Sequence, residues 1–108
     1  MDIKQLTEKM NQLVDHHGWY DSDSPKTQTP RNLAISLCLE AAEVLEHFQW
    51  SDAPKDQVGF EGELADVALY LLQLASVSGV DLEEAILKKI DQNWDRVWQE
   101  DLGKEEKA

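Results

Sequence analysis

The sequence has few of the residues that interrupt helices or cross-link chains. It contains five glycines and three prolines in 108 residues, and no stretch alternates polar and apolar residues over the length of a strand. Its apolar residues instead recur every three or four positions, which predicts an all-α protein. The single cysteine, Cys38, excludes an internal disulfide, and Met1 to Gln5 lack the basic and then apolar order of a signal peptide. We therefore expect a cytoplasmic protein.

Positive charge and long apolar runs are also scarce. Ten Lys and Arg residues face 22 Asp and Glu residues, which gives a formal net charge of −12. Such a surface repels a phosphate backbone, so duplex nucleic acid is not an expected partner. Strongly apolar stretches such as Val67 to Ala75 are far shorter than the roughly 18 residues that cross a bilayer, so no membrane helix is expected. With 42% apolar residues and four tryptophans, the chain is still apolar enough to fold as one domain.

Four helices are expected, and local residues predict several of their ends. Gly18 and Gly79 follow amphipathic stretches and should end two helices, whereas Thr29-Pro30 and Asp81 are typical helix starts. The expected helices cover residues 3–17, 30–50, 57–78 and 81 to about 98.

These helices predict one four-helix, bundle-like domain over residues 1–98, followed by a charged tail over residues 99–108. The second helix is apolar nearly all round, which predicts a central position in the bundle. It stays apolar beyond what three neighbouring helices need to cover. We therefore expect a dimer or a dimer of dimers, with sites near the subunit interfaces.

Two pairs of carboxylates lie at helical spacing. Glu40 and Glu43 interrupt the otherwise apolar second helix, and Glu63 and Asp66 share one face of the third helix. At about 100° per residue, the two stripes contain Ser36, Glu40, Glu43, His47 and Trp50, and Glu63, Asp66, Tyr70 and Gln73. Because a short connection joins these helices, they should pack as antiparallel neighbours and bring the four acids together.

Few cations are available to balance these acids. The candidates are Arg31 at the start of the second helix and Lys88, Lys89 and Arg96 on the fourth. Burying unpaired carboxylates is unfavourable, and hard oxygen ligands favour Mg²⁺, with Mn²⁺ as a substitute. A zinc site fits poorly, because Cys38 stands alone and His16-His17 lack partners at ligand spacing. The pattern therefore predicts a site for a hard divalent cation.

Two other interpretations of the acids are considered. A di-iron carboxylate bundle uses Glu-x-x-His pairs, and His47 instead lies four residues after Glu43. A non-catalytic acidic helical interaction module is the alternative function. Isolated acids such as Glu61 are expected to lie on solvated faces.

The acids and their flanking blocks resemble a known enzyme family. Glu40-Ala-Ala-Glu43, 19 intervening residues and Glu63-Leu-Ala-Asp66 resemble the ExxE…ExxD signature of the MazG-like all-α nucleoside triphosphate pyrophosphohydrolases. Blocks that are similar to the small dCTP-pyrophosphatase branch are Thr29 to Leu33, Phe48 to Trp50, Asp66-Val67 with Tyr70, and Asp81-Leu82 through Lys89 to Asn93. The resemblance implies hydrolysis of a nucleoside triphosphate, expected to be a dNTP, to the monophosphate and pyrophosphate, as in sanitation of nucleotide pools.

The resemblance also implies roles for individual residues. The expected catalytic metal ligands are Glu40, Glu43, Glu63 and Asp66, with one glutamate left to orient or deprotonate the attacking water. The candidate substrate residues are Lys89, Asn93 and Arg96 for the phosphates, Trp19, Trp50 and Tyr70 for stacking on the base or sugar, and Asn32 for a polar contact.

Overall fold

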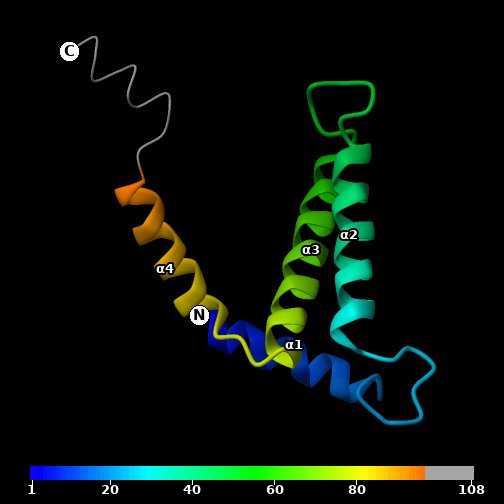
Figure 1. The fold of residues 1–108 in the computed structure, drawn as a ribbon. Coiled ribbons are helices and arrows are strands. Elements are labelled where there is room, and N and C mark those ends of the chain that lie inside the picture. Colours follow the sequence, from blue (N-terminus) through cyan, green and yellow to red (C-terminus); the bar gives the residue numbers. More distant parts are fainter. Residues whose placement is uncertain (97–108) are drawn as a thin grey trace.

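A computed structural model describes residues 1–96, which form four α-helices and no strand (Figure 1). The helices are α1 (Ile3–His16), α2 (Pro30–Glu46), α3 (Gln57–Val77) and α4 (Leu82–Asp95). The all-α prediction is confirmed. The expected tail and the last residues of the expected domain, from residue 97 onward, lie outside the described residues.

Local side chains fix the helix starts. Each helix is preceded by a residue whose side-chain oxygen accepts a hydrogen bond from the backbone N–H three positions later; these caps are Asp2, Thr29, Asp56 and Asp81. Gly18 and Gly79 have φ angles of 71° and 69°, a left-handed conformation that favours glycine, just after α1 and α3. The predicted starts at Pro30 and after Asp81 are therefore confirmed.

Helix α2 ends at Glu46, earlier than the predicted end at Trp50. Beyond it the backbone N–H groups of His47 and Phe48 bond to carbonyls three residues back, which tightens the chain. Phe48 then lies edge-on to Phe60 of α3, with ring centroids 5.5 Å apart. With the helix ended at Glu46, Trp50 leaves the acidic stripe and is 90% exposed.

Helices α2 and α3 form an antiparallel hairpin, α1 crosses its lower end, and α4 projects away (Figure 1). The main contact of α4 is with α1. The prediction of a bundle-like packing of all four helices is therefore wrong for a single chain. The buried apolar residues of the described chain all lie on the first three helices: Met10, Val14, Leu33 and Ala75.

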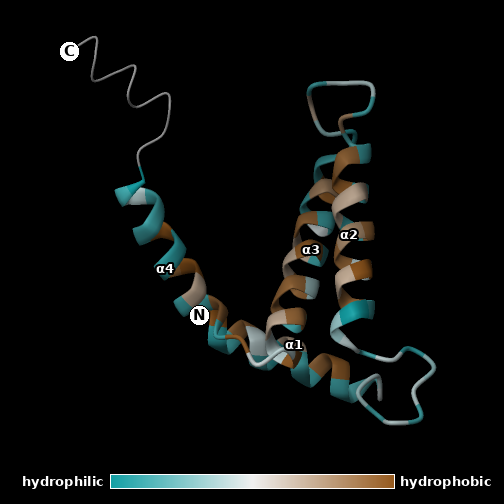
Figure 2. Ribbon diagram, in the orientation of Figure 1, coloured by the Kyte–Doolittle hydropathy of each residue, from teal (hydrophilic) through white to brown (hydrophobic). Residues whose placement is uncertain are grey.

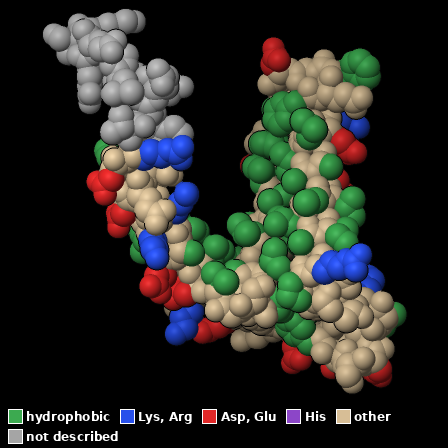
Figure 3. All heavy atoms as spheres, viewed as in Figure 1, with side chains coloured by type: hydrophobic (Ala, Val, Ile, Leu, Met, Phe, Trp, Pro, Cys, Tyr) green, Lys and Arg blue, Asp and Glu red, His purple; other side chains and the backbone are tan. Residues whose placement is uncertain are grey.

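Helix α2 is apolar but not central. Leu39 is 62% exposed and Leu45 is 70% exposed, whereas Leu33 is its buried apolar residue. Apolar residues occur on several sides of α2 (Figure 2), and hydrophobic side chains cover much of the visible face of the α2–α3 pair (Figure 3). The predicted central position is wrong within one chain, because α4 does not cover this surface.

Within residues 1–96, no single helix is long and apolar enough to cross a membrane. Helices α3 and α4 meet that criterion only when taken together, and they are bent by 104° at the break between them.

Candidate functional site

The two acid pairs converge between α2 and α3. Burial raises the pKa of Glu40, and a hydrogen bond and negative charge from Glu43 raise it further. The charges of Asp66 and Glu63, from the facing helix, also raise the pKa of Glu40. Glu40 therefore lies within electrostatic reach of the other three acids, as the antiparallel packing of α2 and α3 predicts.

Two oxygens of this cluster are buried. Glu40 Oε2 has no hydrogen-bond partner in the described structure, and Glu63 Oε2 has an ion-pair contact with His47 but no hydrogen bond. Buried carboxylate oxygens of this kind are suited to a hard cation. In the described part of the chain, no three His, Cys, Asp or Glu side chains already surround one point at coordination distance. Carboxylate oxygens are the donors that a hard cation such as Mg²⁺ takes, although these side chains do not form a closed ligand shell.

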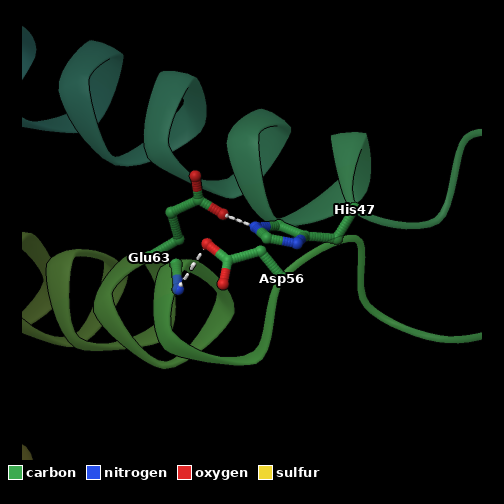
Figure 4. Close-up of polar contacts among 4 residues, drawn as sticks. His47, Asp56 and Glu63 are labelled. Atoms are coloured by element: carbon green, nitrogen blue, oxygen red, sulfur yellow. Dashed lines mark hydrogen bonds and ion pairs between the residues drawn. The ribbon is translucent and has the colours of Figure 1, made fainter.

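His47 is a buried polar residue beside the acids (Figure 4). Its Nε2 forms an ion-pair contact with Glu63 Oε2, and its ring packs against Phe60 with centroids 5.5 Å apart. Its Nδ1 is buried without a hydrogen-bond partner among the described residues. The sequence placed His47 on the stripe of Glu40 and Glu43 but predicted no role for it. The contact shows that it holds one side of the Glu63 carboxylate.

Asp66 connects the acid cluster to a cavity of about 250 Å³. The cavity lies between α1, the loop that precedes α2, and α3; Trp19 and Tyr70 line its wall. These are two of the three aromatic residues that the sequence predicted at the substrate. Because Asp66 lines the same cavity, the aromatic wall of the cavity is next to the acid cluster.

The same cavity contains polar residues that sequence reasoning missed. Lys26 and Gln28 enter it from the loop, and Gln73 enters from α3. Lys26 Nζ lies 5.4 Å from the centroid of the Trp19 ring. Gln73 was on the predicted stripe without a role, whereas no periodic pattern marks a loop residue. The loop after Trp19 therefore contributes to the site directly.

The other predicted substrate residues are not brought to this cavity by one chain. The Asn32 side chain donates to the carbonyl oxygen of Thr27 at 2.9 Å and fastens the loop to the start of α2. Trp50 lies in the turn beyond α2. Lys89 and Asn93 are exposed on α4, which contacts mainly α1, and Arg96 is the residue that follows α4.

Residues 35–108 match the MazG-like family. Among curated proteins, the chain is 39% identical to dCTP pyrophosphatase 1 of Rattus norvegicus, a match that covers 70% of this chain and 50% of that protein. It is 37% identical to a dATP/dGTP diphosphohydrolase of Salmonella phage PMBT28, over 76% of this chain and 25% of that protein. The chain thus spans about half the length of the rat protein and 25% of the length of the phage protein.

The fold is also similar to a solved structure. A pyrophosphatase from Archaeoglobus fulgidus matches with a TM-score of 0.68 and 33% sequence identity. The match covers 84% of this chain and 87% of the other. The arrangement of helices described above is therefore shared with a protein of similar length.

Proposed function

The chain belongs to the MazG-like family, and from this premise we propose that it hydrolyses nucleoside triphosphates to nucleoside monophosphate and pyrophosphate. The observation that carries the proposal is the convergence of Glu40, Glu43, Glu63 and Asp66 from two helices. The names of the relatives, a dCTP pyrophosphatase and a dATP/dGTP diphosphohydrolase, support a deoxynucleotide substrate. Removal of unwanted nucleotides from the pool is the role that this activity would serve.

Mg²⁺ would be held by the four carboxylates, with Mn²⁺ able to replace it. The buried Oε2 of Glu40 supports this assignment, because a hard cation would give this unpartnered oxygen a partner. A bound divalent cation would lower the pKa of water and neutralise charge on the triphosphate. Without cations, a cluster of carboxylates would repel a substrate that carries about four negative charges.

The protein's own groups would position the water and the substrate. One of the glutamates would orient the attacking water or accept its proton, and the His47 contact keeps Glu63 in place for its part. Lys26, which lines the cavity with Asp66, would contact a phosphate oxygen from within the same chain. Trp19 and Tyr70 would flank the base or sugar in the cavity.

The remaining predicted contacts require assembly. The exposed apolar surface of α2 supports a dimer or a dimer of dimers, because such a patch on a lone chain would face water. Lys89, Asn93 and Arg96 on or next to α4 would then meet the phosphates from a neighbouring copy. Trp50 and Asn32 stay predicted nucleotide contacts that only the assembled protein would complete.

A panel of nucleotides tests the proposed activity. The protein is incubated with each dNTP and NTP in Mg²⁺, and the products are separated by anion-exchange chromatography. Monophosphate with an equal amount of pyrophosphate is expected, and it should disappear with EDTA. Diphosphate with inorganic phosphate, or no turnover of any nucleotide, would contradict the proposal. Glu61→Gln serves as the control, because Glu61 is an exposed acid of α3 outside the cluster.

A further inference from the structure

Two glutamine side chains meet in the cavity, from segments far apart in the sequence. Gln73 Nε2 donates to Gln28 Oε1 at 2.6 Å, and Gln73 is only 4% exposed. Both residues line the cavity that also contains Trp19 and Tyr70. A buried amide is unfavourable unless its polar groups are used, so this pair has a defined hydrogen-bond arrangement.

Neighbouring groups fix which way each amide faces. Gln28 Nε2 donates to the backbone carbonyl of Lys26 at 2.7 Å, and a carbonyl can only accept. Gln28 must therefore turn its oxygen toward Gln73, and the NH₂ group of Gln73 must donate to that oxygen. A swap of oxygen and nitrogen in either amide would place like groups against each other.

Tyr20 uses the second N–H of Gln73. Burial raises the pKa of Tyr20, and a hydrogen bond with Gln73 opposes that rise, as a donor to the phenol oxygen does. The Tyr20 hydroxyl itself donates to Asn11 Oδ1 at 2.5 Å, and Asn11 Nδ2 donates to Ser76 Oγ at 3.0 Å. With its NH₂ group turned toward Gln28 and Tyr20, Gln73 leaves its carbonyl oxygen for a ligand in the cavity.

The order of residues along α3 places this oxygen at the far end of a nucleotide. Asp66 belongs to the acid cluster, Tyr70 follows one turn later, and Gln73 lies seven residues, or roughly 10 Å, beyond Asp66. With phosphates at the acids and the base beside Tyr70, the tip of the base approaches Gln73. In cytosine and adenine that tip is an amino group, and in uracil, thymine, guanine and hypoxanthine it is a keto oxygen.

We propose that Gln73, held by Gln28 and Tyr20, is a specificity-determining residue that selects nucleotides whose base carries an amino group at its tip. An amino tip donates to the Gln73 oxygen, whereas a keto tip would leave two acceptors facing each other in a buried site. The inference rests on the proposed function, since it assumes that the cavity receives the base of the substrate.

Pairs of matched substrates test the group at the tip of the base. The tip is an amino group in dCTP and a keto oxygen in dUTP, and the same difference separates dATP from dITP. The wild-type protein is expected to show a kcat/KM at least about tenfold higher for the amino member of each pair that it hydrolyses. Gln73→Leu should bring this ratio close to one. Equal rates within the pairs, or a preference for the keto member, would overturn the proposal.

A second variant tests the orientation of the amide without removing it. Tyr20→Phe deletes the phenol oxygen that holds the second N–H of Gln73, so this N–H becomes free to donate to a keto tip and the ratio should fall. This variant also decides the question if Gln73→Leu does not fold, as judged by circular dichroism. Gln57→Leu, at an exposed glutamine at the start of α3, should leave the ratio unchanged. An unchanged ratio in Tyr20→Phe would contradict the held orientation.

A binding measurement separates this inference from the proposed activity. If no triphosphate is hydrolysed, the proposed function fails, and calorimetric titration with dCMP and dUMP still examines the cavity. Tighter binding of dCMP by the wild-type protein, lost in Gln73→Leu, would support the role of Gln73. Equal affinities for the two monophosphates would overturn it.

Discussion

The α2–α3 hairpin and helix α4 both carry many apolar side chains, yet they differ in what covers these side chains. The hairpin and α1 enclose the buried polar residues His47 and Gln73. Helix α4 has no buried residue, and Trp94 on it is 83% exposed. Its apolar residues follow the same helical period. The period of a helix therefore shows that a face needs a partner, but not where the partner is.

The same difference divides the proposed site. One chain brings its four acids together, because both pairs lie on the two helices that pack most closely. It does not bring Lys89 and Asn93 to them, because those residues lie on the helix that projects away. The proposed metal site therefore lies within one chain, whereas the proposed phosphate contacts of α4 need an assembled protein.

Removing one carboxylate of the hairpin should have the largest effect. Glu63→Gln and Asp66→Asn each keep the side-chain shape but delete a charge and a metal ligand, so nucleotide hydrolysis is expected to fall at least about a hundredfold. Metal-free Asp66→Asn should melt at or above the wild-type temperature, because repulsion within the cluster is relieved, whereas Glu63→Gln also loses the ion pair with buried His47. Thermal melts in EDTA and pyrophosphate release are the measurements.

Stabilisation by Mg²⁺ tests whether these carboxylates bind a metal. The wild-type protein should gain about 2.7 kcal/mol of stability at a hundredfold excess of Mg²⁺ over its Kd, and the two variants should gain less. Glu61→Gln should behave as wild type in every respect. If it instead loses activity as Glu63→Gln does, the effect comes from general acidity rather than from a site.

Placing a charge on α4 tests the other half of the comparison. Leu87→Asp changes a side chain that is exposed in one chain, so the helical content should stay unchanged. Light scattering should show the wild-type protein at a multiple of 12.3 kDa and the variant at 12.3 kDa itself. Activity should fall about tenfold or more with the loss of charge-assisted phosphate contacts. A wild-type protein that is monomeric at micromolar concentration would contradict the assembly.

Within the hairpin, Tyr70 and Trp50 give a sharper contrast. Tyr70 lines the cavity, so Tyr70→Ala should raise KM by about 5-fold to 150-fold through the loss of roughly 1–3 kcal/mol of stacking. Trp50→Ala removes a ring that no part of the described chain covers, and its fold should survive. An unchanged KM in Tyr70→Ala, with circular dichroism unaltered, would remove this residue from the site.

The smallest expected effect concerns pH. The pKa of Glu40 is raised in the folded chain above its usual 4.5, so the folded state holds this proton more tightly than the unfolded state. Its contribution to stability is complete below about pH 4.5 and is lost as the pH rises through the raised value. Metal-free wild-type protein should therefore lose more melting temperature between pH 5 and pH 8 than Glu40→Gln does. The exposed Glu46→Gln should keep the wild-type slope.

Sequence reasoning succeeded where the determinants are local. The caps at Thr29 and Asp81 and the glycines after α1 and α3 act within a few residues of the ends they fix. The two acid pairs were found because their spacing matches a helical turn. The family followed from the same acids, and the comparisons confirm it.

Sequence reasoning failed where distant contacts decide. Just beyond the end of α2, Phe48 packs against Phe60 of α3. The hydrophobic pattern of α2 alone does not predict a contact with another helix. The Gln28–Gln73 pair joins residues 45 positions apart, one of which lies in a loop without period. The direction of α4 depends on which surface covers it, and its own sequence gives only the side that needs covering.

Binding of Mn²⁺, followed by the loss of its free electron paramagnetic resonance signal, tests the central claim most directly. The wild-type protein and Glu61→Gln should bind the ion with similar affinity, and added Mg²⁺ should displace it. Glu63→Gln should bind it at least about tenfold more weakly, because one charged ligand is missing. If Glu63→Gln binds Mn²⁺ as tightly as the wild type, or the wild type does not bind it, the four carboxylates of α2 and α3 are not a metal site.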